Sequence, residues 1–219
     1  MRLPVLVVNF KTYPSATGKN AVELAKIHQK MAEKTGISIA LAVQAVDLRF
    51  VTENVDLPVF AQHFDVAEQG AFTGYVSPYS LKDAGAYGSL LNHAERKLPV
   101  DVLQSSIDLA RSQGLFTIVC AESVFASKAV SELSPDLVAF EPPELIGGDV
   151  SVSNAQPQLI QDAVAMMGKG KVLVGAGIKT AEDVKLALKF GAAGVLVSSV
   201  VTRAHDPEKA LEELLKGFL

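Results

Sequence analysis

A glutamate at the end of an apolar, strand-like run is the best candidate for acid–base chemistry in this chain of 219 residues. The run covers residues 137–141 and ends in Glu141. A carboxyl group at the end of a buried strand loses part of its hydration, which raises its pKa towards the range of a general base at neutral pH. Glu141 is therefore the first candidate base, although a solvated glutamate in a turn would leave the same pattern.

The segment after Glu141 has the composition of a loop that closes over a site. Pro142 and Pro143 fix φ at one end of it, whereas Gly147 and Gly148 permit large backbone changes at the other. Loops of this kind often exclude water from an active site when they close. We therefore expect residues 142–149 to form a lid.

Other polar residues follow apolar runs in the same way: Asn9, Lys11, Gln62, Asn92, His93 and Glu95. A base, an imidazole and a cation around one cavity would suit proton abstraction next to a carbonyl group. A lone histidine after a strand is more often structural than catalytic. We expect a helical turn to begin at His93, where a helix N-terminus would disfavour the imidazolium form.

Two turns rich in small residues predict an anion site in the last quarter of the chain. Residues 175–177 read Gly-Ala-Gly, and Ser198 and Ser199 follow another apolar run. Small residues let backbone N–H groups approach an anion closely, as a phosphate site at a helix start requires. These two turns are the candidate phosphate site. The alternative is that the glycines only form a tight turn.

These side chains need a scaffold that brings strand ends together, and the sequence predicts one. Eight apolar runs alternate with segments of helical periodicity. The expected strands cover residues 5–10, 37–43, 59–62, 88–92, 116–120, 137–141, 172–175 and 194–198. Uniformly apolar strands separated by helices indicate a parallel sheet that is covered on both faces.

Eight such units predict a (β/α)8 barrel, an α/β fold, formed by residues 1–219 as a single domain with trimmed helices. Catalytic residues in this fold lie at the carboxyl ends of the strands. A doubly wound open sheet is the competing topology. It would place a glycine-rich turn after the first strand, whereas Asn9, Phe10 and Lys11 stand there.

The composition favours a small-molecule substrate over a macromolecular partner. The formal net charge is −4 and neither sign of charge forms a long block, so we expect neither nucleic-acid nor membrane binding. The single cysteine, Cys120, lies in an apolar run and reads as a core residue more than as a catalytic thiol. No metal-ligand spacing and no leader segment are evident, so we expect a cytoplasmic location and no metal.

The order of these motifs along nearly the full chain resembles triosephosphate isomerase in its compact archaeal form. The resemblance rests on residues 9–11 (NFK), 92–96 (NHAER) and 139–147 (AFEPPELIG), with 69–74 (QGAFTG) similar to the family's protruding third loop. It implies reversible conversion of dihydroxyacetone phosphate to glyceraldehyde 3-phosphate without a cofactor. The combination is specific, although the phosphate loops alone occur in many barrels.

The resemblance also implies a role for each site residue. Glu141 is similar to the general base, and His93 to the neutral electrophile that polarises the carbonyl group; this family is itself the known example of that pairing. Lys11 would offset the charge of the enediolate, and Asn9 would hold a substrate oxygen. Glu95 would support the site by pairing with Lys11.

The remaining matches concern the phosphate group and the lid. Gly177, Ser198 and Ser199 match phosphate-binding positions, and Ile146 matches one in the closing loop. The lid lacks the tryptophan and the Thr-Gly ending of bacterial and eukaryotic members. Shortened helices would expose barrel surface that another subunit could cover, so we expect a homodimer or a homotetramer.

The sequence leaves two other classes of function open, another barrel enzyme and a non-catalytic protein. A Schiff-base aldolase, or another sugar-phosphate isomerase, could use the same fold and the same phosphate loops. The aldolase needs a desolvated lysine inside the barrel, but Lys11 is the only lysine at a predicted strand end. A non-catalytic sensor of sugar phosphates is the second alternative.

Overall fold

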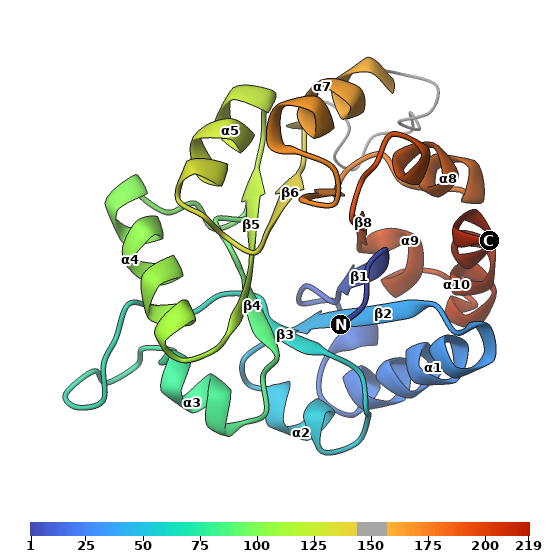
Figure 1. The fold of residues 1–219 in the computed structure, drawn as a ribbon. Coiled ribbons are helices and arrows are strands. Elements are labelled where there is room, and N and C mark those ends of the chain that lie inside the picture. Colours follow the sequence, from blue (N-terminus) through green and yellow to red (C-terminus); the bar gives the residue numbers. More distant parts are fainter. Residues whose placement is uncertain (144–156) are drawn as a thin grey trace.

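The computed structural model describes residues 1–143 and 157–219, and its strands close into a parallel barrel of eight (Figure 1). The strands follow one another around the barrel in chain order, and pairing of the last strand with the first completes the closure. They are β1 (Val5–Asn9), β2 (Ser38–Val43), β3 (Val59–Ala61), β4 (Gly88–Leu91), β5 (Phe116–Ala121), β6 (Leu137–Phe140), β7 (Val172–Val174) and β8 (Gly194–Val197). The predicted (β/α)8 architecture is confirmed.

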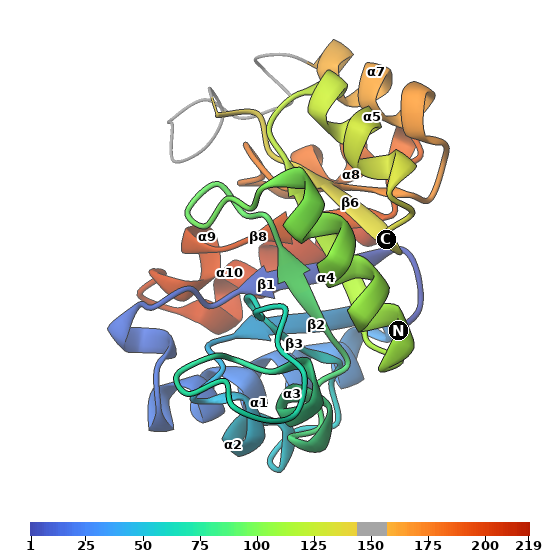
Figure 2. The ribbon, with the colours of Figure 1, turned by 90° about the vertical axis from the view of Figure 1, so that its left-hand side faces the viewer.

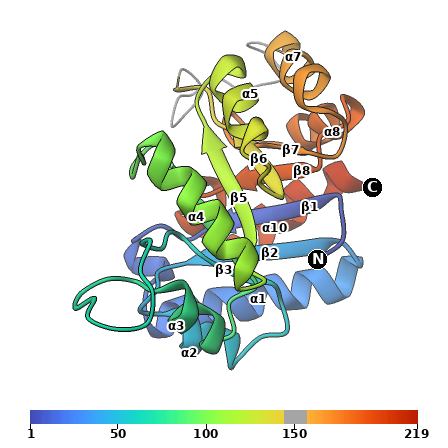
Figure 3. The ribbon, with the colours of Figure 1, turned by 60° about the vertical axis from the view of Figure 1, so that its left-hand side comes forward.

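The described helices surround the barrel, as Figures 1–3 show from three directions. They are η1 (Pro14–Ala16), α1 (Lys19–Thr35), α2 (Leu48–Thr52), α3 (Pro78–Asp83), α4 (Val100–Ser112), α5 (Val124–Glu132), α7 (Pro157–Met167), α8 (Ala181–Lys189), α9 (Ser199–Thr202), α10 (Pro207–Leu215) and η3 (Lys216–Phe218). Within the described ranges, none is long and apolar enough to cross a membrane. Several have five residues or fewer, which is how a chain of this length accommodates the whole fold.

All eight predicted strands are present, and their ends differ from the prediction by one residue at most. β4 ends at Leu91 and not at Asn92, because Asn92 has a φ of 57° and leaves the extended conformation. β6 ends at Phe140, although the Glu141 N–H still donates to the Ala121 carbonyl oxygen at 2.8 Å. The polar residues therefore begin where the regular ladder stops.

Alternation along β1 determines which side chains enter the barrel. Val5 and Val7 belong to the inner cluster of buried residues, whereas Leu6 and Val8 belong to the larger cluster beneath the helices. Successive strand residues point to opposite faces, so the next inward position is Asn9. Asn9 is 5% exposed and lies at the carboxyl end of the barrel.

The same alternation along β6 directs Glu141 inward. Leu137 and Ala139 belong to the inner cluster, and Phe140 belongs to the cluster beneath the helices. Continuing the series by one residue places Glu141 above Ala139, at the same end of the barrel as Asn9. Strand periodicity and barrel closure together bring these two side chains to one rim.

Two glycines with positive φ allow a direct test of how tightly the barrel closes. A Cβ added to Gly194, at the start of β8, would overlap the Val5 carbonyl oxygen of β1, whereas a Cβ on Gly36 would meet nothing within 4 Å. We expect Gly194→Ala to lower the free energy of unfolding by more than about 3 kcal/mol. Gly36→Ala should lower it by only about 1–2 kcal/mol, since it introduces backbone strain without a steric overlap.

Urea unfolding of both variants measures these changes. If Gly194→Ala and Gly36→Ala lowered the free energy of unfolding equally, β1 and β8 would not be packed as closely at Gly194 as the structure shows.

Candidate active site

A cavity of about 560 Å³ opens at the carboxyl ends of the strands and collects most of the predicted site residues. Its lining includes Asn9, Lys11, His93, Glu141, Gly177, Ser198 and Ser199. Glu95 lines an adjoining cavity of about 340 Å³, which shares Lys11 and His93 with the first. Ile146 and the rest of the predicted lid beyond Pro143 lie outside the described residues.

Glu141 is the buried carboxyl group of this cavity, with a residue exposure of 5%. Burial raises its pKa to about 7, while a hydrogen bond with the Cys120 thiol and the charge of Lys11 partly oppose that shift. Its Oε2 atom is buried without a hydrogen-bond partner in the described part of the chain. A carboxyl group with this pKa and an unused oxygen can accept a proton at neutral pH.

Gly175 makes room for this carboxyl group, a role that does not follow from its place in the sequence. A Cβ on Gly175 would lie 2.5 Å from Cγ and 3.1 Å from Oε1 of Glu141. Any other residue at position 175 would therefore displace the Glu141 side chain. The sequence shows the glycine but not the contact, because the two residues come from neighbouring strands, β6 and β7.

His93 faces Glu141 across the cavity, with Nε2 3.7 Å from Oε1. The Glu95 backbone N–H donates to Nδ1 of His93 at 3.1 Å, so in the neutral ring the proton is carried by Nε2. Burial and the charge of Lys11 lower the pKa of His93. The imidazole is thus held neutral, with an N–H donor directed towards Glu141.

The expected cause of this neutral state is wrong. The structure has no helix beginning at His93, since α4 starts only at Val100. The residues after His93 form a turn in which the Arg96 N–H donates to the His93 carbonyl oxygen at 2.7 Å. Desolvation and a neighbouring ammonium group, and not a helix N-terminus, disfavour the imidazolium form.

Lys11 supplies the cation of the site and pairs with a carboxylate across the barrel mouth. Its Nζ lies 2.7 Å from Oε1 of Glu95, the contact that the resemblance implies. Lys11 has a φ of 48°, and its N–H donates to Oδ1 of Asn9 at 3.0 Å. An aldolase lysine must present a neutral amine, so this ion pair disfavours the Schiff-base alternative.

Gln62 holds this part of the backbone in place, a role that its position in the sequence did not reveal. Its Nε2 donates to Oδ1 of Asn9 at 3.1 Å and to the Lys11 carbonyl oxygen at 3.0 Å. These bonds support a residue in the left-handed region, where a non-glycine conformation is strained. Gln62 therefore fixes the backbone at Lys11 and with it the direction in which the Lys11 side chain points.

The predicted phosphate residues form the opposite wall of the cavity. Gly177 has a φ of 72°, which favours glycine, and Ser198 precedes the short helix α9. The Oγ atom of Ser198 is buried and, among the described residues, has no hydrogen-bond partner. A buried hydroxyl group with an unused bond suits a polar ligand, because leaving it unpaired is costly.

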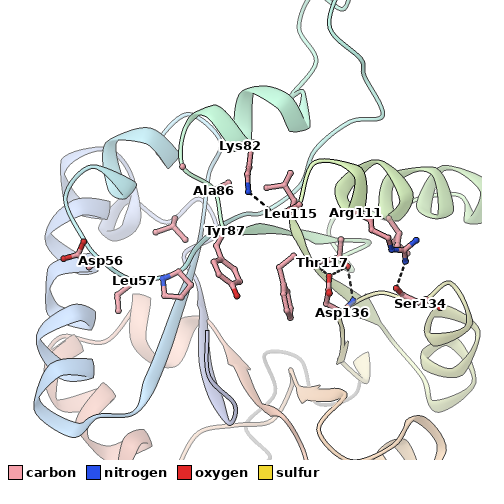
Figure 4. A pocket seen from close by; sticks show the side chains of 16 residues that line it. Asp56, Leu57, Lys82, Ala86, Tyr87, Arg111, Leu115, Thr117, Ser134 and Asp136 are labelled. Carbon is pink, nitrogen blue, oxygen red and sulfur yellow. Dashed lines mark hydrogen bonds between the residues drawn. The ribbon is translucent and has the colours of Figure 1, made fainter.

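A larger cavity, of about 640 Å³, lies at the other end of the barrel, among the residues that begin β3, β4 and β5. Figure 4 shows that several of its polar side chains, among them Lys82, Arg111 and Thr117, are already hydrogen-bonded. Arg111 donates to the Ser134 carbonyl oxygen at 2.9 Å, and the Thr117 hydroxyl donates to Asp136 at 2.9 Å. We place the active site in the cavity of about 560 Å³, because its lining includes two buried oxygen atoms without partners among the described residues and a buried carboxyl group whose pKa is raised.

Among the described residues, the other titratable side chains lack the grouping that a metal ion needs. Across residues 1–143 and 157–219, no three histidine, cysteine, aspartate or glutamate side chains are grouped to hold an ion. Cys120 is buried, and burial together with the Glu141 charge raises its thiol pKa well above the ordinary value. It is therefore a poor nucleophile, as its apolar surroundings in the sequence predict.

The comparison with known proteins agrees with this geometry. The family model described as triosephosphate isomerase matches residues 4–216. The chain belongs to the triosephosphate isomerase family. The triosephosphate isomerase of Methanocaldococcus jannaschii is 45% identical over 97% of this chain and 99% of its own. Those of Methanosarcina acetivorans and Pyrobaculum calidifontis are 43% and 42% identical, over 99% and 100% of this chain and 99% and 98% of theirs.

The contact between Gly175 and Glu141 predicts a specific catalytic defect. Gly175→Ala should displace the carboxyl group, and a shift of about 1 Å can reduce the isomerase kcat roughly a hundredfold. Glu141→Asp shortens the side chain that Gly175→Ala displaces. It should therefore lower kcat by a much smaller factor in the Gly175→Ala variant than in the parent enzyme. Steady-state kinetics of the two single variants and the double variant test this. Parent-like turnover by Gly175→Ala, or simple additivity, would disprove the steric contact.

The raised pKa of Glu141 also predicts how stability depends on pH. Below the ordinary carboxyl pKa of 4.5 the group is neutral in both the folded and unfolded states, whereas above about 7 the folded state must bury a charge. The folded state holds the proton more tightly, so between pH 4.5 and 7 this group lowers the free energy of unfolding as the pH rises. Between these pH values the free energy of unfolding falls by up to about 1.4 kcal/mol per pH unit.

Glu141→Gln removes this titration. The variant should gain stability over the parent at pH 8 and lose that advantage at pH 4.5, as measured by urea unfolding at both pH values. Glu68→Gln, at an exposed position, is the control and should show no such pH-dependent difference. A constant difference between Glu141→Gln and the parent would mean that the carboxyl group is not desolvated.

Proposed function

We propose that this protein is a triosephosphate isomerase that interconverts dihydroxyacetone phosphate and D-glyceraldehyde 3-phosphate without a cofactor. The observation that carries the proposal is the pairing of a buried carboxyl group of pKa about 7 with a neutral imidazole 3.7 Å away. Family membership over residues 4–216 identifies the reaction. The reaction belongs to glycolysis and gluconeogenesis.

In the proposed mechanism Glu141 removes a proton from the carbon next to the carbonyl group, which gives an enediolate. Its pKa lies near the working pH, where a base can both take up and return a proton. The Nε2–H group of His93 donates to the substrate oxygens as negative charge develops on them. The hydroxyl proton on the first carbon's oxygen passes to the oxygen of the second carbon, and Glu141 returns its proton to the second carbon. These two transfers complete the isomerisation.

Lys11 and Asn9 act on the same oxygens. The Lys11 side chain is 19% exposed, so its ammonium group would stabilise the enediolate and the phosphate more strongly than a fully solvated charge could. Asn9 is oriented by Gln62 and by the Lys11 N–H, and would position a substrate oxygen. Glu95 keeps the Lys11 side chain extended over the cavity.

The phosphate group would lie against Gly177, Ser198 and Ser199. The glycine φ and the unpaired Ser198 hydroxyl support this placement, together with the family match. Ile146 contributes from the closing loop in the proposal, which rests for that residue on the family pattern alone.

A coupled assay with dihydroxyacetone phosphate tests the function, and Glu141→Asp tests the base. The shorter side chain withdraws the carboxyl group by roughly 1 Å, so kcat should fall about a hundredfold. Binding of phosphoglycolate, a mimic of the enediolate, should change far less. Absence of turnover in the parent would support the sensor, and trapping of the ketose phosphate on a lysine by borohydride would support the aldolase.

We also propose that the protein works as a homodimer or a homotetramer. The loop between β3 and α3 projects from the body of the barrel in Figures 1–3 and carries an edge-to-face pair, Phe72 and Tyr75, of which Tyr75 is 57% exposed. Phe125 and Val100, at the starts of α5 and α4, are 83% and 71% exposed. Apolar side chains left in water on two separate surfaces are consistent with two kinds of subunit contact.

Light scattering during size-exclusion chromatography measures the subunit number. If both surfaces are used, the parent is a tetramer, Phe125→Ser reduces it to a dimer, and Phe72→Ser with Tyr75→Ser disrupts the other contact. Met166→Ser, on α7, is the control and should leave the assembly unchanged. A parent that is monomeric at micromolar concentration would contradict the proposal.

We propose that residues 1–219 form one folding domain, since the β1–β8 pairing joins the first strand to the last. A cytoplasmic location fits an enzyme of central carbon metabolism.

A further inference from the structure

Arg203 lies beside the proposed phosphate wall but has no part in the mechanism described so far. It lines the same cavity as Gly177, Ser198 and Ser199. Its backbone N–H donates to the Ser199 carbonyl oxygen at 3.1 Å, so it stands one helical turn beyond that serine. The arginine is exposed, and in the described part of the chain no carboxylate forms an ion pair with it.

The ring of Tyr13 holds the guanidinium group at the mouth of the cavity. The Arg203 Cζ atom lies 5.9 Å from the centre of the Tyr13 ring, within the range of a cation–π contact. Tyr13 is half-buried, packs against the core beneath the helices, and also lines the cavity. The Tyr13 ring therefore favours one position of the long Arg203 side chain, which would otherwise move freely in solvent.

Backbone contacts fix the two loops that carry this pair. β1 and β8 are hydrogen-bonded neighbours in the barrel, and Tyr13 and Arg203 follow them. The Ser15 hydroxyl donates to the Thr202 carbonyl oxygen at 2.5 Å and ties the loops together next to the pair. Tyr13 comes two residues after Lys11, so one short segment carries both Lys11 and the ring that contacts Arg203.

The charges around the cavity explain what a second cation can add. Lys11 is already paired with Glu95 at 2.7 Å, so the carboxylate offsets part of its charge. Gly177, Ser198 and Ser199 can donate hydrogen bonds to a phosphate group but carry no net charge. Lys179 also lines the cavity, but it already interacts with another group. A phosphate dianion gains from an exposed guanidinium group nearby, and this gain is largest at low ionic strength.

We propose that Arg203, held by Tyr13, is a substrate-binding residue that attracts the phosphate dianion to the cavity. It lies on the side of the non-reacting phosphate, so it stabilises the bound substrate and the transition state equally and acts on KM and not on kcat. The inference rests on the proposed phosphate site.

The test compares two arginine variants that differ only in place. Arg203→Gln should raise KM for dihydroxyacetone phosphate about three- to fivefold at low salt with kcat nearly unchanged, and Arg203→Lys should fall between it and the parent. Arg111→Gln removes the same charge at the opposite end of the barrel and should leave KM unchanged. Added salt should reduce the difference between Arg203→Gln and Arg111→Gln.

Tyr13→Leu provides the second arm. If the ring positions the guanidinium group, this substitution should raise KM, and adding Arg203→Gln to it should raise KM less than in the parent. Calorimetric binding of phosphoglycolate gives the same comparison without turnover. Equal KM values for Arg203→Gln and Arg111→Gln in an active enzyme would overturn the inference alone, whereas an inactive parent would overturn the proposed function.

Discussion

The burial of one carboxyl group, that of Glu141, is the physical constraint on which the rest of the site depends. The closed barrel removes the group from water and raises its pKa to about 7, while the Cys120 thiol and the Lys11 charge keep the shift from being larger. Gly175 leaves the space that the group occupies, and His93 faces it with a neutral ring. An open sheet would leave the same residues solvated and give the group an ordinary acidity.

Two strained residues direct the other side chains towards this carboxyl group. Lys11 and Asn92 have positive φ values of 48° and 57°, each just past the end of a strand. Such conformations cost on the order of 1 kcal/mol or more and persist only where neighbouring contacts support them. Gln62 supports Lys11, and Asn92 bonds to the Cys120 carbonyl oxygen at 3.0 Å and to the Leu98 N–H at 2.9 Å. The bend at Asn92 turns the chain before His93.

Much of this arrangement could be predicted from the sequence because strand periodicity is local. Apolar runs marked all eight strands, and the residues that follow them marked the rim to which Asn9 and Glu141 belong. The pairing of Lys11 with Glu95 was reached only through the family resemblance, because the two lie 84 residues apart and meet only when the barrel closes.

Contacts between neighbouring strands could not be predicted in this way. Gly175 looked like part of a phosphate turn, whereas its closest contact is with Glu141. The low pKa of His93 was attributed to a helix, but burial and a charge from another strand cause it. The pair formed by Tyr13 and Arg203 joins the two ends of the chain. Each of these three contacts joins residues that are far apart in the sequence and become neighbours only when the barrel closes.

Direct titration of the Glu141 side chain is the measurement closest to the central claim. In protein labelled with ¹³C at the glutamate carboxyl carbon, the Glu141→Gln variant identifies the resonance, and its chemical shift reports protonation of the ligand-free enzyme. The account predicts a midpoint near pH 7. A midpoint at or below the ordinary value of 4.5 would contradict it, because the carboxyl group would then be as well hydrated as one on the surface.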